Sequence, residues 1–312
     1  MELSGDALRA AGAVGIRPHE PDDQSEPTCE EPDAESHVGG HGSVPWQEPG
    51  QRGRLLPRSV SVGPMFTAAD AYDRFMGRYS TFLAPQMADL GRVARGMRVL
   101  DVGCGPGALT AELVKRTGAA SVSAVDPSEP FIEAVRRRHP GVDARVAPAE
   151  ALPFDDGAFD AALAQLVVQF MRDPVAGIRQ MARVTRTDGA VAACVWDMGH
   201  GPVTEFWLAA HELDPSVETE DRRPGVKEGE LARLFGEAGL RTIDASELWV
   251  RLELPSFDAW WGPFELGVGP VGAFVAGLDE PRRAKLRELC RARFPAGAFT
   301  HEVRAWAARG VV

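Results

Sequence analysis

The sequence is poor in cysteine and has no long hydrophobic run. Its four cysteines lie far apart and form no Cys-x-x-Cys pair, a pattern that fits neither a disulfide framework nor a zinc site. No segment approaches the roughly 20 consecutive apolar residues that span a membrane, and the N-terminus lacks a basic segment followed by an apolar stretch. These absences predict a cytoplasmic protein with reduced cysteines, no metal site and no membrane span.

An excess of basic residues is missing too. The 312 residues carry a formal net charge of −11, and no stripe of lysine and arginine with interleaved aromatic residues counters that charge locally. An acidic surface repels a phosphate backbone. Nucleic acid is therefore not an expected partner.

Residues 1–64 have the composition of a disordered tail. They contain eight prolines and nine glycines, eleven acidic but only five basic residues, and no sustained apolar period. Such a segment cannot bury enough apolar surface to offset the entropy lost on ordering. Met65 opens the first patterned segment, and we hypothesise that translation of the native protein begins there. We predict a disordered tail over 1–64 and one folded domain over 65–312.

Strand and helix patterns alternate through the rest of the chain. A helical pattern over 70–90 comes first, and an aspartate and a proline at 173 and 174 predict the start of another helix. The alternation predicts a parallel sheet with helices on both faces. A mostly helical segment over about 255–295 interrupts the last two strands. The predicted strands are 98–102, 121–125, 144–147, 159–164, 190–195, 242–252 and 299–307.

A glycine-rich turn follows the first predicted strand. Residues 99–107 read VLDVGCGPG, and glycine lets the backbone approach a ligand closely because it adopts positive φ without a Cβ clash. Dinucleotide enzymes use a similar G-x-G-x-x-G turn. The spacing here is G-x-G-x-G, one residue shorter.

Two aspartates add to this signal. Asp101 lies two residues before Gly103, where a carboxylate would repel the pyrophosphate of NAD but attract the ammonium and sulfonium groups of S-adenosylmethionine (SAM). Asp126 ends the second strand, where a carboxylate can accept hydrogen bonds from both ribose hydroxyls of either nucleoside cofactor. Asp101 therefore favours SAM, whereas Asp126 supports an adenosine ligand without choosing between the two cofactors.

The sequence resembles the small-molecule class I SAM-dependent methyltransferases, including those of quinone biosynthesis. The resemblance rests on residues 98–110, on VDPS at 125–128, and on AEALPF at 149–154 with Phe159 and Asp160, and it covers about 72–239. It implies a Rossmann-like, doubly wound α/β sheet of seven strands, parallel except for an antiparallel last strand. It also implies SAM as methyl donor, leaving as S-adenosylhomocysteine (SAH).

The resemblance assigns a set of residues to the cofactor. It puts Ala149 and Glu150 beside adenine and Gln165 near the methionyl end, and it sets an upstream helix over the cofactor, where Tyr72, Arg78 or Tyr79 meets the carboxylate. Pro148 replaces an acidic residue that commonly binds the adenine amino group. The predicted cofactor-binding set is Asp101, Gly103, Cys104, Gly105, Gly107, Asp126, Pro127, Ala149, Glu150, Gln165, Arg78 and Tyr79.

No catalytic residue is assigned from the sequence. His200, His211 and His301 are candidate general bases, but a surface or structural role is favoured for each, and alignment on a sulfonium leaving group can suffice without a base. Cys104 is expected to pack in the loop. Five aromatic residues are candidates for an apolar acceptor pocket, and one of the adjacent pair at 260 and 261 is expected to face it. They are Trp196, Trp207, Trp260, Trp261 and Phe264.

The expected acceptor is a small apolar or amphipathic molecule, covered by the helical segment over 255–295 as a lid. The segment after the fourth strand reads QLVV, without an Asn-Pro-Pro-Tyr type motif, which argues against methylation of DNA bases. A SAM-binding protein without catalysis, a dinucleotide oxidoreductase and a protein methyltransferase remain as alternatives. The sequence fixes neither the methylated atom type nor the oligomeric state.

Overall fold

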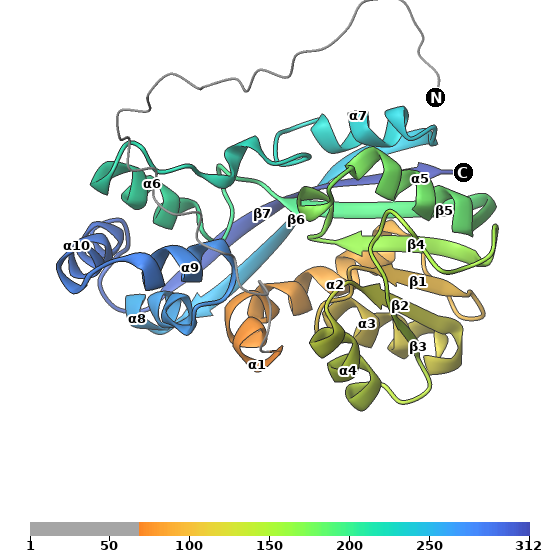
Figure 1. Ribbon diagram of the computed structural model, residues 1–312, viewed down its shortest axis with the longest axis horizontal. Helices are drawn as coiled ribbons and strands as arrows, with labels where there is room; N and C mark the ends of the chain where they lie inside the picture. Colours follow the sequence, from red (N-terminus) through yellow and green to blue (C-terminus); the bar gives the residue numbers. More distant parts are fainter. Residues whose placement is uncertain (1–68) are drawn as a thin grey trace, which may run out of the picture. The chain divides into compact units, whose positions relative to one another are not determined.

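The computed structural model describes residues 69–312, which form a seven-stranded mixed sheet (Figure 1). The strand order is β3-β2-β1-β4-β5-β7-β6, and this confirms the predicted fold class. The predicted tail over 1–64, Met65 and Cys29 lie outside the described residues. The strands are β1 Val99–Val102, β2 Val122–Asp126, β3 Asp143–Val146, β4 Phe159–Gln165, β5 Thr185–Trp196, β6 Arg241–Leu254 and β7 Phe299–Val311.

The central strands are buried on both faces, as the sequence pattern predicts. All four residues of β1 are buried, and β1, β2, β3, β4 and β5 pair in parallel. Parallel strands covered by helices on both sides read as continuous apolar runs. The last strand, β7, runs antiparallel between β5 and β6. The carboxyl ends of β1 to β5 therefore meet at one edge of the sheet.

Helices cover both faces of this sheet. Apolar side chains of α2, α3 and α4 form one buried layer with the strands, and those of α5 and α7 form the other. A π-helical turn over Asp73–Gly77 joins α1 to α2. These helices are α1 Ala69–Tyr72, α2 Arg78–Leu90, α3 Ala108–Thr117, α4 Glu129–Arg138, α5 Pro174–Val184 and α7 Glu230–Glu237. No helix between residues 69 and 312 is long and apolar enough to cross a membrane.

Local signals account for the start of α5, the helix before β5. The Asp173 side chain accepts a hydrogen bond from the backbone N–H of Ala176 at 2.9 Å, and Pro174 is the first residue of α5, as predicted. Strand β5 begins at Thr185, earlier than the strand predicted over 190–195. Asp188, with φ of 60°, lies inside the strand, where the register with β4 jumps between Phe159 and Ala161.

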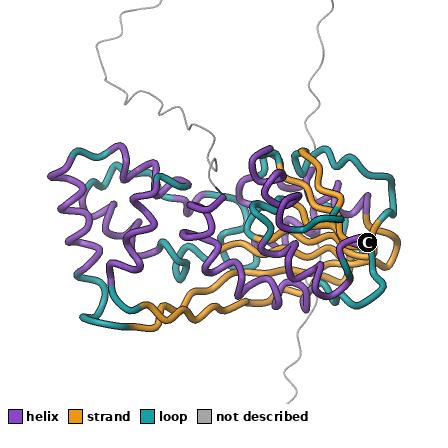
Figure 2. The backbone as a smooth tube through the Cα atoms, turned by 90° about the horizontal axis from the view of Figure 1, so that it is seen from below, coloured by secondary structure: helices purple, strands orange, loops and turns teal. Residues whose placement is uncertain are grey.

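A helical insert lies between β6 and β7, and it confirms the predicted helical segment. It consists of α8 Phe257–Trp261, a 3₁₀ turn over Gly262–Leu266, α9 Gly269–Gly277 and α10 Glu280–Arg291. Together with α6 (Thr204–Leu213) it encloses a separate aromatic core. The strands β6 and β7 extend beyond the sheet to reach it (Figures 1 and 2).

Candidate functional site

The glycine loop after β1 is held against the end of β2. The backbone N–H groups of Gly103 and Cys104 both donate to the carbonyl oxygen of Val125, at 2.8 and 2.9 Å. Gly103 has φ of 69°, and a Cβ there would lie 2.4 Å from the side chain of Val167. Gly105 also has positive φ, 52°, but a Cβ there would enter open space. Close packing therefore requires glycine at 103, whereas the loop leaves room for a ligand above 105.

Asp126 ties this loop to the end of β2. One of its carboxylate oxygens accepts a hydrogen bond from the backbone N–H of Gly105 at 2.9 Å, and the other accepts one from Ser128 at 2.8 Å. Burial raises the pKa of this carboxyl group, and the two N–H bonds counter part of that effect. A carboxylate has about four lone-pair sites, so each oxygen can accept a further hydrogen bond. Asp126 is 8% exposed and keeps acceptor sites unused while it holds the loop, and its role as a ribose ligand stays a prediction.

Four of the predicted cofactor residues line a single cavity of about 680 Å³. They are Gly103, Pro127, Ala149 and Glu150, and they come from the ends of β1, β2 and β3. Pro148 lines this cavity too, and Glu150 accepts a hydrogen bond from the backbone N–H of Arg172 at 2.8 Å. We name this space the cofactor cavity. Its volume, mainly apolar lining and open loop fit a nucleoside-sized group.

Asp101 and Cys104 lie beneath the loop and are not among the residues that line the cavity. Asp101 is 1% exposed and accepts a hydrogen bond from the hydroxyl of Thr110 at 2.6 Å. Burial raises the pKa of Asp101 to about 7, although the Thr110 bond opposes this shift. Burial also raises the pKa of the Cys104 thiol, which agrees with a packing role.

Arg78 and Tyr79, the predicted cofactor residues of α2, contact different parts of the chain. The guanidinium of Arg78 donates to the carbonyl oxygens of Ala259 and Trp260 in the insert, at 2.6 and 3.3 Å. It also lines a second cavity of about 470 Å³, which includes Gly107 at the start of α3. Tyr79 has no exposed surface, and its hydroxyl bonds His301 at 2.9 Å. The roles of Arg78 and Tyr79 as cofactor ligands stay predictions, with other partners occupying both side chains here.

Tyr72 takes a position nearer to the cofactor residues. Burial raises the pKa of its hydroxyl, and the negative charge of nearby Asp126 adds to the effect. Tyr72 also lines a third cavity, on the far side of the loop after β4. It therefore connects the cofactor residues with that cavity.

The end of β4 lies between the two spaces. The amide N–H of Gln165 donates to the carbonyl oxygen of Ser80 at 3.1 Å, while its buried amide oxygen has no partner among the described residues. The next residue, Leu166, has φ of 64°, a strained conformation for a branched side chain. Such strain concentrates at functional sites. The unpartnered oxygen of Gln165 is one polar group that a bound cofactor could satisfy.

The third cavity, with a volume of about 60 Å³, is walled mainly by apolar side chains, and we name it the acceptor cavity after the apolar acceptor pocket predicted from the sequence. It lies beyond the carboxyl ends of β4 and β5, where ligands bind in open α/β sheets. Phe170 lines both this and the cofactor cavity. The walls of the acceptor cavity come from the N-terminal helix, the loops after β4 and β5, the stretch between α6 and α7, and α9.

Of the aromatic residues considered from the sequence, Trp196 lines the acceptor cavity. Trp260 and Trp261 are at most 1% exposed and pack in the aromatic core of the insert, so neither faces the cavity. Sequence reasoning missed Glu220, which lies in a short 3₁₀ turn and is the one carboxylate among the described lining residues. Burial raises the pKa of Glu220. No local pattern distinguishes it from neighbouring acidic residues.

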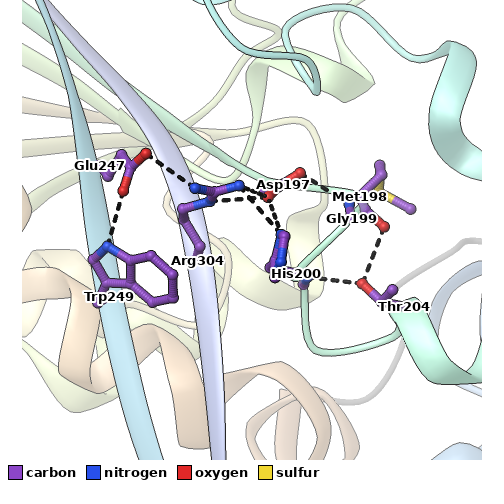
Figure 3. Close-up of polar contacts among 9 residues, drawn as sticks. Asp197, Met198, Gly199, His200, Thr204, Glu247, Trp249 and Arg304 are labelled. Carbon is purple, nitrogen blue, oxygen red and sulfur yellow. Dashed lines mark hydrogen bonds and ion pairs between the residues drawn. The ribbon is translucent and has the colours of Figure 1, made fainter.

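None of the three histidines lines the acceptor cavity as the structure describes it. Figure 3 shows His200 bonded to Asp197 at 3.0 Å, beside two bonds from Arg304 to the same carboxylate oxygen at 2.7 and 2.9 Å. This cluster anchors the turn that carries three lining residues of the cavity, Met198, Gly201 and Val203. His211 is exposed, and burial lowers the pKa of His301 to about 4.

Comparisons with known proteins find methyltransferases among the relatives of this chain. Residues 100–193 match the family described as "Methyltransferase domain". An uncharacterized methyltransferase of Mycobacterium tuberculosis is 35% identical over 139 residues, which cover 45% of this chain and 53% of that protein. A ubiquinone biosynthesis O-methyltransferase of Neisseria meningitidis is 32% identical over 158 residues, 48% of this chain and 66% of that protein. The chain thus spans about half to two thirds of the length of these relatives.

The fold is also found in a solved structure. Phosphoethanolamine N-methyltransferase 2 of Haemonchus contortus, in complex with phosphomonomethylethanolamine and S-adenosylhomocysteine, aligns with a TM-score of 0.51 and 16% identity. The alignment covers 81% of this chain and 59% of that one. At this identity the likeness concerns the fold alone.

Proposed function

Because this chain belongs to the class I SAM-dependent methyltransferases, we propose that it transfers a methyl group from SAM to a small-molecule acceptor. One observation carries the proposal. Residues from the ends of three parallel strands line the cofactor cavity, and that cavity shares Phe170 with an apolar cavity beyond β4 and β5. A methyl donor and an acceptor placed in these two spaces would meet at the common wall.

The residues present fit the cofactor. Asp126 offers its remaining lone pairs to the ribose hydroxyls, and Ala149 and Glu150 flank the adenine. Asp101 lies below the loop, where a bound cation would favour the ionised form of its carboxyl group. Gln165 offers its unpartnered amide oxygen to the ammonium group. When bound, SAM supplies an activated methyl group on a sulfonium leaving group.

The protein's own contribution is alignment. The apolar walls of the acceptor cavity exclude water, and the end of β4 orients the nucleophile relative to the cofactor cavity. The helical insert closes one side of the acceptor cavity through α9, which supports its role as a lid. This enclosure favours a small acceptor over a polypeptide.

The test of the cofactor site is a binding titration with SAH. Asp126→Ala should weaken SAH binding about tenfold or more, because the variant loses the carboxylate that accepts hydrogen bonds from the two ribose hydroxyls. Asp143→Ala is the matched control, since Asp143 lies exposed on β3 and pairs with Arg145. Unchanged SAH affinity in Asp126→Ala contradicts the assignment.

The test of the reaction is incubation with methyl-labelled SAM and fractionated cell extract. Label in small molecules supports the proposal, and label in protein supports the protein methyltransferase alternative. Saturable SAM binding without transfer to any fraction supports a binding protein without catalysis. Pro148 favours this last alternative slightly, because it removes an acceptor for the adenine amino group. Thermal protection by NAD but not by SAM would indicate an oxidoreductase.

A further inference from the structure

Two residues that line the acceptor cavity carry buried polar atoms without a hydrogen-bond partner, and the rest of the wall is mainly apolar. The amide oxygen of Gln169 and the indole N–H of Trp196 are both buried and have no hydrogen-bond partner among the described residues. Gln169 is 8% exposed and Trp196 is 7% exposed. Buried polar groups are nearly always satisfied in native proteins, so these two atoms call for a partner. Their shared cavity indicates that a ligand provides it.

The chemical identity of both atoms is fixed by the structure. The amide nitrogen of Gln169 donates to the carbonyl oxygen of Leu166 at 3.1 Å, which leaves the amide oxygen as the free group. Leu166 is the strained residue at the end of β4, so the amide is anchored to that turn. The indole nitrogen of Trp196 can only donate. The two lining residues therefore carry one unpartnered acceptor and one unpartnered donor.

The charged residues of the lining satisfy each other. Glu220 forms an ion pair with Arg223 at 2.9 Å and accepts a hydrogen bond from Trp207 at 3.3 Å. Arg223 also lies over the ring of Phe170 at 4.7 Å. No positive charge in the described lining is left for an anion, and the oxygen of Gln169 repels one. A carboxylate or phosphate group does not fit this cavity.

We propose that the acceptor cavity recognises the uncharged, hydroxyl-bearing end of a mainly apolar acceptor. This inference rests on the proposed function and specifies its substrate class. A hydroxyl group combines a donor for Gln169 with an acceptor for Trp196. The cavity volume of about 60 Å³ holds roughly four to six water-sized spheres. It therefore admits the reacting end of the acceptor, while the remainder extends outward.

The experiment compares three small probes with the full chain in saturating SAH: phenol, anisole and benzoate. Ligand-observed saturation-transfer NMR measures their relative affinities. Phenol should bind about tenfold more tightly than anisole, which lacks the donor for Gln169, and benzoate should not bind. Failure of phenol to bind, equal affinity for phenol and anisole, or a preference for benzoate overturns the inference.

Two variants assign the effect to the two atoms. Gln169→Leu should bring phenol and anisole to equal affinity, and Trp196→Phe should weaken both. The matched controls are Gln86→Leu and Trp249→Phe, whose side chains make hydrogen bonds elsewhere, on the surface. Both controls should retain the wild-type preference. Loss of the preference in a control, or its retention in Gln169→Leu, overturns the inference.

The SAH titration separates this inference from the proposed function. If the wild-type chain does not bind SAH, the proposed function fails. If SAH binds and label is transferred from SAM but the probes show no preference for the hydroxyl, only the substrate class is wrong.

Discussion

Replacing Asp101 with asparagine tests the electrostatics beneath the glycine loop. The carboxyl group is 1% exposed, and its hydrogen-bonding partner is the neutral hydroxyl of Thr110 at 2.6 Å. Asparagine has nearly the shape of the protonated acid and can still accept the Thr110 bond. Asp101→Asn therefore removes the ionised state and leaves the packing in place.

The magnitude follows from the pKa of Asp101. The group has a pKa of about 7 in the folded chain, against an ordinary value of 3.8, and each unit corresponds to about 1.4 kcal/mol. A raised pKa contributes stability that is present below the unfolded value and is lost as the pH rises through the folded value. The free energy of unfolding of the wild-type chain should thus fall by about 4 kcal/mol between pH 4 and pH 7 through this one residue.

Urea unfolding of both proteins between pH 4 and pH 8, without SAM, measures this difference. The wild-type chain and the variant should have similar free energies of unfolding near pH 4, and Asp101→Asn should be more stable by about 4 kcal/mol at pH 8. Carboxyl groups far from Asp101 titrate alike in both proteins, so they cancel in the comparison, whereas nearby Asp126 interacts with Asp101 and does not cancel. Parallel stability curves would refute the reasoning.

The same residue predicts a pH dependence of SAM binding. A cation beside Asp101 favours its ionised form, so SAM affinity should rise with pH up to about 7, by at most about tenfold per unit. Asp101→Asn should show a flat profile over this range. An equally steep profile in the variant would mean that other groups control the binding.

Three further changes test the packing and the cavities. Gly103→Ala should destabilise the chain by about 1–3 kcal/mol in chemical denaturation, because its Cβ would lie 2.4 Å from Val167. Gly105 also has positive φ, but a Cβ there enters open space, so Gly105→Ala should destabilise the chain less. The reverse order would contradict the loop packing. Arg78→Met should speed hydrogen exchange in 257–291, because it removes both bonds to α8; unchanged exchange would show that the insert does not need them. Glu220→Gln should permit benzoate binding in the NMR assay, because its arginine partner loses the neutralising charge; continued exclusion of benzoate would show that this ion pair does not control selectivity.

Much of the fold could be predicted from the sequence because parallel α/β sheets constrain their own topology. Alternating apolar strands and amphipathic helices leave few arrangements, and the carboxyl ends of neighbouring strands must then meet. Gly103, Pro127 and Ala149 lie far apart in the chain, yet each follows a strand of the parallel set and all line one cavity. Their assignment to the cofactor remains a prediction that the titrations address.

Partners of individual side chains were harder to predict. Arg78 and Tyr79 are adjacent, but successive residues of a helix point about 100° apart, so one reaches the insert and the other enters the core. Which of these directions meets a ligand depends on segments about 180 and 220 residues later. Glu220 carries no local pattern, because its role depends on the wall that the insert and the loop after β4 build around it.

The helical insert lies between two antiparallel strands. This placement separates evolutionary change in the insert from change in the glycine loop. The strands β6 and β7 remain paired along their length, whatever their far ends carry. Helices α8 to α10 can therefore lengthen, shorten or exchange side chains without moving the loops at the ends of β1, β2 and β3. New acceptor preferences could arise in this segment while the glycine loop stays as it is.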